Sequence, residues 1–499
     1  MKTRCNGLVL VVGLLASLAG CIDFEQDQAD FCLRNPARCG EPLTQAAHDA
    51  GSTTDSGMTG EEDAGIATDS GTPDAGGVDS GTPADAGAQG EADAGTPADA
   101  GRAVTRVVAG NGFGLELMKD GSVWARGNND YGQLGNGTTD QRLTPVQVLG
   151  LTGVASLAAG ASHSLALKAD GTVWAWGDNS TGQLGDGTRT QRLTPVQVSG
   201  LTGVASLSAG ASHSLALKAD GTVWSWGSNY IGQLGDGTTG DRLTPVQVPG
   251  LTGVAALAAG AYHSLALKAD GTVWAWGYNA VGQLEEGTTD PRLTPVQVPG
   301  LTGVAALAAG FAHSLALKAD GSVWAWGDND YGQMGDGTTD DRLTPVQVSG
   351  LTGVAALAAG VYHSLALKAD GRVWAWGYNA YGQLGDGTTD DRLTPVQVSG
   401  LTGVAALAAG AFHSLALKAD GSLWAWGDND YGQLGDGTIG RRPTPVPVLG
   451  LTGEAALAAG FAHSLALKAD GRVWAWGYNT DGQLGPSRPS YTLVPLPIR

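Results

Sequence analysis

Most of the chain alternates apolar and polar residues in four short stretches, and this pattern recurs every 50 residues from Ala103 onward. In one copy the stretches are Val404–Ala409, His413–Leu417, Ser422–Gly427 and a segment near Val446–Val448. Because side chains of a strand alternate between its two faces, a period of two predicts β-structure. We therefore expect four short strands in every copy.

A tight turn is predicted between the second and third strands. Asp420-Gly421 fits a two-residue hairpin, because glycine adopts a positive φ without strain. A tryptophan follows three residues after this glycine and marks each copy. These tryptophans are Trp124, Trp174, Trp224, Trp274, Trp324, Trp374, Trp424 and Trp474, which makes eight copies.

The alternation also predicts how the copies pack. Trp424 and Trp426 share one face of the third strand, whereas Leu423 and Ala425 share the other. We therefore expect each sheet to have a bulky face that is buried on the small face of the next copy. Twisted sheets stacked in this way close into a ring. The predicted fold is all-β, a β-propeller in which each four-stranded blade is one continuous unit and the Ala-rich first strand lies nearest the axis.

The motifs of the repeat resemble those of the regulator of chromosome condensation repeat family. They read Ala408-Ala-Gly410, His413-Ser-Leu-Ala-Leu417, Asp420-Gly421, Leu423-Trp-Ala-Trp-Gly427 and Gly432-Gln-Leu-Gly435. The resemblance covers residues 103–499 and implies the same propeller fold. Members of that family typically have seven blades. Eight copies occur here, so we expect eight blades, with seven blades and an accessory copy as the alternative.

The N-terminus has the features of an export signal over residues 1–20. Lys2 and Arg4 precede an apolar run that is too short to span a bilayer. Leu18-Ala-Gly-Cys21 resembles the lipobox of bacterial lipoproteins, and this resemblance implies that Cys21 is acylated and anchors the chain. The alternative is an ordinary secretory signal with an incidental cysteine. Because Ile22 rather than aspartate follows, the analogy favours the outer membrane, so we expect a cell-envelope protein on its periplasmic or outer side.

Two further segments separate the signal from the repeats. In residues 21–44, Cys32 and Cys39 are predicted to form a disulfide outside the cytoplasm, with a metal pair as the alternative. Residues 45–102 repeat Asp-Ala-Gly and Gly-Thr-Pro and contain almost no large apolar side chains. Such a segment cannot bury a core, and we expect a disordered acidic linker.

The charge balance excludes one class of partner. The chain has a net charge of −20, and residues 1–101 contain 17 acidic and 4 basic residues. Neither this segment nor the repeats offer a basic surface, so nucleic acid is not an expected partner.

The repeats contain no constellation that predicts catalysis, a cofactor or a metal site. Seven copies place a histidine at the same position, from His163 to His463, and Phe113 replaces it in the first copy. Equivalent positions in adjacent sheets lie about 10 Å apart, too far for shared metal ligation, so we expect structural histidines bonded to nearby backbone. His413 and Ser414 point to opposite faces of one strand and cannot act together as base and nucleophile.

The copies differ mainly in the loop between the first and second strands (A–B) and the loop between the third and fourth (C–D). In a sheet of alternating strands these loops emerge on one face of the ring. Aromatic and acidic residues recur there, which is typical of an interface, although drift in tolerant loops is the alternative. The predicted binding face comprises Tyr230, Tyr262, Tyr278, Phe311, Asp328, Tyr331, Tyr362, Tyr378, Tyr381, Phe412, Asp428, Tyr431, Phe461 and Tyr478.

These features favour a non-enzymatic, lipid-anchored scaffold that binds a protein, or a glycan, at the cell envelope. The family resemblance implies two alternatives. Some secreted members inhibit β-lactamases through one propeller face, and the family's namesake is a guanine nucleotide exchange factor for a small GTPase. Export removes the chain from cytosolic GTPases, which disfavours the second alternative.

Overall fold

The computed structural model describes residues 103–284, 288–479 and 490–497, all within the repeats. The predictions for residues 1–20, 21–44 and 45–102, with Cys21, Cys32 and Cys39, lie outside the described residues. Within the described part, no helix has the length and hydropathy that a membrane span requires.

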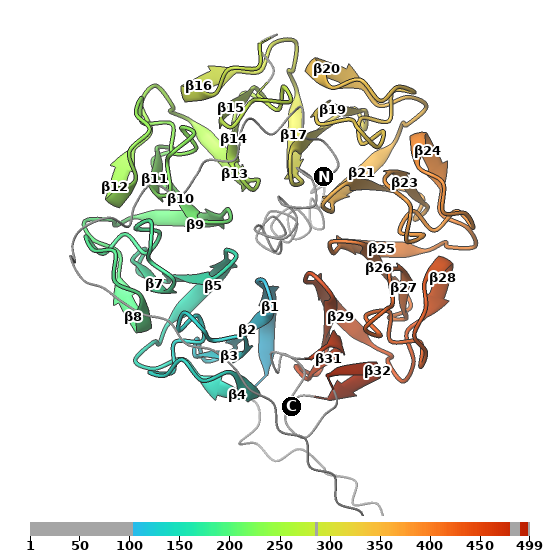
Figure 1. Ribbon diagram of the computed structural model, residues 1–499, viewed down its shortest axis with the longest axis horizontal. Coiled ribbons are helices and arrows are strands. Elements are labelled where there is room, and N and C mark those ends of the chain that lie inside the picture. The colour runs from blue at the N-terminus through green and yellow to red at the C-terminus, as the bar shows by residue number, and fades with distance from the viewer. Residues whose placement is uncertain (1–102, 285–287, 480–489, 498–499) are drawn as a thin grey trace, which may run out of the picture. The chain divides into compact units, whose positions relative to one another are not determined.

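Eight antiparallel four-stranded sheets form a closed ring of blades (Figure 1). Blade 1 consists of β1 to β4 and blade 8 of β29 to β32, and in every blade the four strands follow one another in sequence order. The predicted all-β propeller with one continuous unit in each blade is confirmed. Eight blades are present, so the seven-bladed alternative is wrong.

The two inner strand positions of the blades are as follows. The strands nearest the axis are β1 (Val104–Ala109), β5 (Val154–Ala159), β9 (Val204–Ala209), β13 (Val254–Ala259), β17 (Val304–Ala309), β21 (Val354–Ala359), β25 (Val404–Ala409) and β29 (Glu454–Ala459). The second strands are β2 (Phe113–Met118), β6 (His163–Lys168), β10 (His213–Lys218), β14 (His263–Lys268), β18 (His313–Lys318), β22 (His363–Lys368), β26 (His413–Lys418) and β30 (His463–Lys468). As predicted, the Ala-rich strand lies innermost.

The two outer strand positions complete each blade. The third strands are β3 (Val123–Gly127), β7 (Val173–Gly177), β11 (Val223–Gly227), β15 (Val273–Gly277), β19 (Val323–Gly327), β23 (Val373–Gly377), β27 (Leu423–Gly427) and β31 (Val473–Tyr478). The outermost strands are β4 (Arg142–Gln147), β8 (Arg192–Gln197), β12 (Arg242–Gln247), β16 (Arg292–Gln297), β20 (Arg342–Gln347), β24 (Arg392–Gln397), β28 (Arg442–Pro447) and β32 (Tyr491–Pro497).

The outermost strand begins earlier than predicted. The sequence placed it near Val446–Val448, whereas β28 spans Arg442–Pro447. Its register with β27 shifts where Ala425 pairs with Val446 and Gly427 pairs with Arg442, so the strand contains a bulge. Pro445 lies in this stretch. Because proline is tolerated only at edges and bulges of a sheet, it argued against a strand in the sequence-based prediction.

The prediction of one bulky and one small face per sheet is wrong. Cross-strand pairing places Leu415 beside Ala425 on one face and Ala416 beside Trp424 on the other. Each face therefore combines the large side chains of one strand with the small side chains of its neighbour. The blades still nest, because the tryptophan side of one blade meets the leucine side of the preceding blade.

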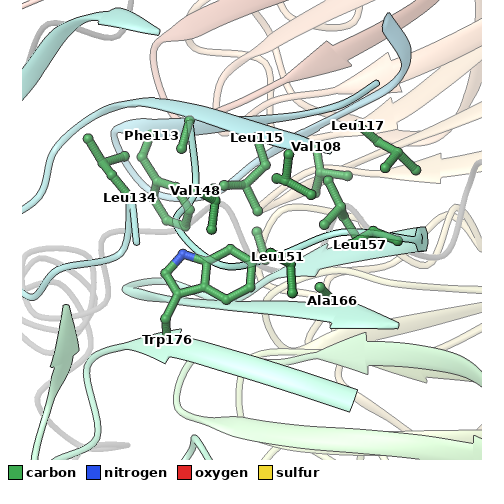
Figure 2. Close-up of a cluster of buried hydrophobic side chains, with 14 residues drawn as sticks. Val108, Phe113, Leu115, Leu117, Leu134, Val148, Leu151, Leu157, Ala166 and Trp176 are labelled. Carbon is green, nitrogen blue, oxygen red and sulfur yellow. The ribbon is translucent and has the colours of Figure 1, made fainter. Parts of the chain in front are cut away.

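The core lies between adjacent blades. Figure 2 shows Trp176 of blade 2 packed against Phe113, Leu115 and Leu134 of blade 1. The Trp176 side chain is fully buried, and its indole N–H donates to the Gln133 carbonyl of blade 1 at 2.8 Å. The bond recurs from Trp226, Trp276, Trp326, Trp376, Trp426 and Trp476 to the preceding blade. One indole in each of these seven blades thus fixes the spacing to its neighbour.

The ring closes by packing blade 8 on blade 1. Val104 and Met118 of blade 1 lie in one apolar cluster with Leu465 and Val473 of blade 8. The backbone N–H of Val104 donates to the Gly471 carbonyl at 3.1 Å. No strand of the described chain is shared between the first and last blades, so side-chain packing and this backbone bond close the ring.

Candidate binding face

The A–B and C–D loops lie side by side, as predicted. The N–H of Tyr378, which opens a C–D loop, donates to the carbonyl of Tyr362 in the A–B loop at 3.0 Å. The hairpin turns between second and third strands instead contact the loops that enter the next blade, as in the 3.0 Å bond from Val154 N–H to Gly121 carbonyl. The two loop sets therefore occupy different faces of the ring.

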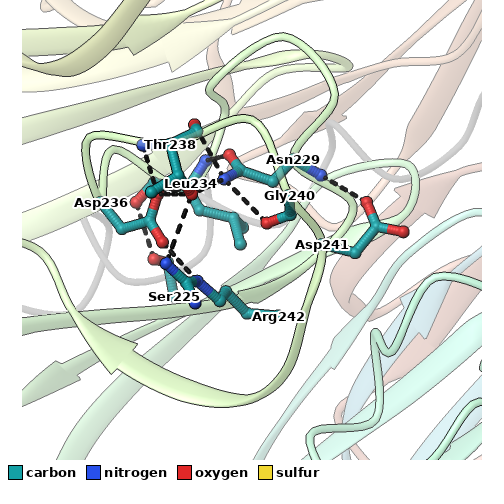
Figure 3. Close-up of polar contacts among 8 residues, drawn as sticks. All are labelled: Ser225, Asn229, Leu234, Asp236, Thr238, Gly240, Asp241 and Arg242. Atoms are coloured by element: carbon teal, nitrogen blue, oxygen red, sulfur yellow. Dashed lines mark hydrogen bonds and ion pairs between the residues drawn. The ribbon is translucent and has the colours of Figure 1, made fainter.

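A recurring polar frame holds each C–D loop. In blade 3 the Asn229 side-chain amide donates to the Thr238 and Gly240 carbonyls at 3.0 and 3.1 Å, and its oxygen accepts from Leu234 N–H (Figure 3). Asp236 accepts from Thr238 and pairs with Arg242 of β12. The frame fixes the loop backbone, so the variable positions beside it are presented on a rigid support.

The aromatic residues of these loops form one connected cluster over blades 3 to 8. Its closest ring contact joins Tyr331 and Tyr378, with centroids 4.8 Å apart, and Tyr381 contacts Phe412 at 5.0 Å. We call this cluster the aromatic crescent. Its members are Tyr230, Tyr262, Tyr278, Phe311, Tyr331, Tyr362, Tyr378, Tyr381, Phe412 and Phe461.

Tyr431 and Tyr478 form a second aromatic pair beside the crescent. Their ring centroids are 4.9 Å apart, and the planes meet edge to face. All twelve aromatic residues that the sequence placed on the binding face thus lie in the crescent or in this pair.

The crescent is less exposed than the sequence suggested. Tyr230 exposes 51% of its surface, whereas Phe311 and Tyr362 expose only 8% and 9%. Tyr431 of the adjacent pair exposes 42%. The buried rings pack against neighbours from adjacent blades and against aliphatic side chains such as Val281 and Val361. The crescent is therefore a packed apolar surface of buried and partly buried rings with Tyr230 exposed, rather than a row of separate anchors.

The crescent does not run around the whole ring. The A–B loops of blades 1 to 3 carry Gly112, Ser162 and Ser212 at the position of Tyr262 in blade 4. Tyr131 of blade 1 is exposed, at the repeat position of Tyr331, and lies outside the aromatic cluster. Blades 3 to 8 thus carry the connected aromatic surface, whereas the variable positions of these loops in blades 1 and 2 hold small and polar residues apart from Tyr131.

The two predicted aspartates are largely buried at the start of their loops. Asp328 accepts from the Gln333 side-chain amide at 3.0 Å, and Asp428 accepts from the Gln433 amide at 2.7 Å. Burial, followed by the charge of Asp430, raises the pKa of Asp428 to about 6. Both aspartates brace their loops, a role that the sequence did not reveal.

The sequence also missed two charged features of the face. Carboxylate oxygens of Asp328, Asp330 and Asp341 lie within 4.8 Å of one another, a donor set that suits a hard cation. Asp328 already accepts from the Asp330 N–H, and Asp341 from the Asn329 N–H. The second feature is Arg441, whose guanidinium lies 4.2 Å from the centre of the Tyr381 ring. The sequence did not reveal either feature, because the carboxylates meet only when the blade 5 loop folds back on itself and Arg441 meets Tyr381 only across two blades.

Six of the seven repeated histidines bond to a serine side chain of the next blade, which corrects the prediction of backbone partners. His163 Nε2 lies 3.1 Å from Ser214 Oγ in the next blade, and Ser214 donates onward to the Gln183 carbonyl. Both side chains are fully buried. Burial lowers the pKa of the repeated histidines to about 3 or 4. As expected, His413 does not bond Ser414; its partner is Ser464 of blade 8.

Fold and face together define an eight-bladed propeller of one repeated unit whose copies differ mainly in the loops of one face. A family model described as the RCC1-like domain matches residues 85–360 and 342–499, and the chain belongs to this family. A search of curated proteins found no match.

Solved structures of similar proteins agree with this family assignment. Yeast RCC1 (Prp20), solved with Kap60, is 28% identical over 67% of this chain and 85% of its own, with a TM-score of 0.54. A second structure of Prp20p, from Saccharomyces cerevisiae, gives 28% identity over 67% and 87% of the two chains, with a TM-score of 0.55. Human WBSCR16 is 27% identical over 70% of this chain and 99% of its own, with a TM-score of 0.58.

Proposed function

We propose that the chain is a cell-envelope lipoprotein whose propeller binds a protein partner through the aromatic crescent and the adjoining aspartates. The observation that carries this proposal is that aromatic residues from six consecutive blades, 3 to 8, contact one another in one connected cluster on one face. Drift in nearly identical loops does not predict rings that contact one another from blade to blade. Aromatic residues are also the side chains most enriched at the centres of protein interfaces.

The similar solved structures support a binding role. One describes yeast RCC1 bound to Kap60, and another describes the binding of Prp20p to Gsp1p and histones. Those partners belong to those proteins. What we carry over is that a propeller of this family presents surfaces to other proteins.

We propose binding rather than catalysis. The His–Ser pairs are the arrangement closest to a nucleophile with its base, yet both members are fully buried between blades. A substrate cannot reach the serine oxygen without separating the blades, so these pairs suit a structural role.

Capture of partners from envelope extracts tests the binding face. Replacing Tyr331, Tyr381 and Tyr431 by alanine removes three tyrosines of the face in blades 5 to 7, and we expect capture to fall about tenfold or more. Tyr131→Ala is the matched control, because it removes an exposed tyrosine from the same repeat position outside the crescent. Equal capture by the triple variant and the wild-type chain would refute the proposed face.

Membrane fractionation tests the anchor. With Cys21 replaced by serine, no acyl chain can be attached, and we expect the chain to move from the membrane fraction to the soluble fraction. Cys32→Ser is the control and should leave the chain in the membrane fraction. A Cys21→Ser chain that stays with the membrane would show that lipidation is not what holds it.

A further inference from the structure

The C–D loops that border the crescent are strongly acidic in blades 5 to 7. Asp336, Asp386 and Asp436 pair with Arg342, Arg392 and Arg442 of the outermost strands. Beyond these pairs the three loops contain a single basic residue, Arg441. Their remaining aspartates are Asp328, Asp330, Asp340, Asp341, Asp390, Asp391, Asp428 and Asp430.

Arg441 shows how this surface accommodates a cation. Its guanidinium lies 4.2 Å from the centre of the Tyr381 ring, and it donates to the Ala380 carbonyl at 3.3 Å. A cation over an aromatic face is stabilised by the ring quadrupole. Burial raises the pKa of Asp428, and the positive charge of Arg441 acts on the same carboxylate to lower it.

The equivalent position one blade earlier carries the opposite charge. Arg441 of blade 7 reaches the Tyr381 ring of blade 6. Fifty residues earlier in the repeat, the equivalent positions are Asp391 in blade 6 and Tyr331 in blade 5. The blade 5 loop adds the three clustered carboxylates of Asp328, Asp330 and Asp341. At Tyr331 the repeat thus places Asp391 where Tyr381 has Arg441, and the Asp391 carboxylate accepts from the Asn379 N–H of its own loop at 2.7 Å.

We propose that the partner is a polypeptide that presents arginine or lysine among apolar side chains, with a basic side chain over Tyr331 beside the aspartates of blade 5. This inference rests on the proposed function and specifies its partner. The apolar residues of the partner contact the crescent, and its cations contact the loops that border it. Such complementarity sets specificity and the rate of association.

Two labelled synthetic peptides test the proposal with the full chain. One repeats Gly-Arg-Leu-Gly, and in the other glutamine replaces every arginine. We expect fluorescence anisotropy to show binding of the arginine peptide and at least about tenfold weaker binding of the glutamine peptide. Equal binding of both peptides would overturn the proposal, as would binding of envelope polysaccharide in place of either peptide.

A matched pair of double variants separates this site from diffuse attraction to an acidic protein. Asp330→Asn/Asp430→Asn removes two charges from the C–D loops, whereas Asp320→Asn/Asp420→Asn removes two from the hairpin turns of the same blades. We expect only the first double variant to weaken binding of the arginine peptide, by about tenfold. Equal weakening by both pairs would overturn the proposal. Near-ultraviolet circular dichroism of the tryptophans verifies that each variant is folded.

Envelope capture distinguishes the two proposals. If Asp330→Asn/Asp430→Asn captures as much partner as the wild-type chain while the triple tyrosine variant captures none, the proposed function stands and the basic partner is refuted. If neither variant loses capture, both proposals fail.

Discussion

Blade 1 departs from the other blades at several buried positions, including four in β2 and β3. Phe113, Gly114, Glu116 and Arg126 replace the usual histidine, serine, alanine and second tryptophan. By cross-strand pairing, Gly114 and Glu116 share a face with Arg126, and this face meets blade 8. His463 of blade 8 would meet a serine at position 114, and its Nε2 has no hydrogen-bond partner among the described residues. The positive charge of Arg126 adds to burial in lowering the pKa of His463.

Glu116 and Arg126 form a buried ion pair at this junction, and the pair gives a prediction. Glu116→Ala leaves the guanidinium buried without its carboxylate, so the free energy of unfolding should fall by about 3–5 kcal/mol. Glu116→Ala/Arg126→Trp restores the residues of the other blades, and its stability should lie within about 1 kcal/mol of wild type or above it. Urea unfolding measures both. A double variant as unstable as the single one would contradict this account.

Residue-level burial was the least predictable property of the candidate site. The sequence shows that Phe311 and Tyr362 are variable loop residues, but it does not show that their rings are 5.9 Å apart across two blades. Burial of each ring depends on a side chain about 50 residues away. Asp328 and Asp428 were also expected at the surface and are largely buried, where each accepts from the glutamine five residues further along its loop.

At the scale of elements, the local sequence pattern predicted the bounds of three strands in each blade but not those of the fourth. β25, β26 and β27 match the predicted bounds to within one residue, because alternation and the Asp-Gly turn are contained in the sequence itself. β28 pairs through a bulge, and its Pro445 contradicts ordinary strand preference. Its position is set by pairing with β27, which local pattern does not encode.

The loops illustrate the opposite case. Their assignment to one face followed from strand direction alone, and the Tyr378–Tyr362 backbone bond confirms it. Their rigidity did not follow, since the Asn229 frame joins residues that only the folded loop brings together. A fixed frame with variable neighbours lets the copies diverge in surface chemistry while the blades keep one structure.

At the scale of the whole molecule, the closed ring makes each blade depend on both neighbours. The indole bonds and the His–Ser contacts run from blade to blade, and all of them cross the interfaces between sheets. A substitution that destabilises one interface between blades therefore destabilises the whole ring. In an open array, by contrast, the terminal repeats have a neighbour on one side only. This coupling also places seven buried histidines in a single cooperative unit.

Those histidines predict a strong dependence of stability on acid. Their pKa values in the folded chain are about 3 or 4, below the value of 6.5 expected after unfolding. Between these limits the unfolded chain binds more protons. Stability is therefore fully present above about pH 6.5 and is lost as the pH falls toward 4, by about 1.4 kcal/mol per pH unit for each histidine.

Urea midpoints measured between neutral pH and about pH 4.5 check this dependence. His413→Phe, the residue that blade 1 carries at this position, should lower proton uptake on unfolding by about one proton while the chain still folds. Asp428 acts in the opposite direction, because its raised pKa makes ionisation destabilising as the pH rises toward 6. The effect of this one carboxylate on the free energy of unfolding is smaller than the combined effect of the seven histidines. A midpoint that stays constant from pH 6.5 to about 5 would mean that the histidines are protonated within the folded ring.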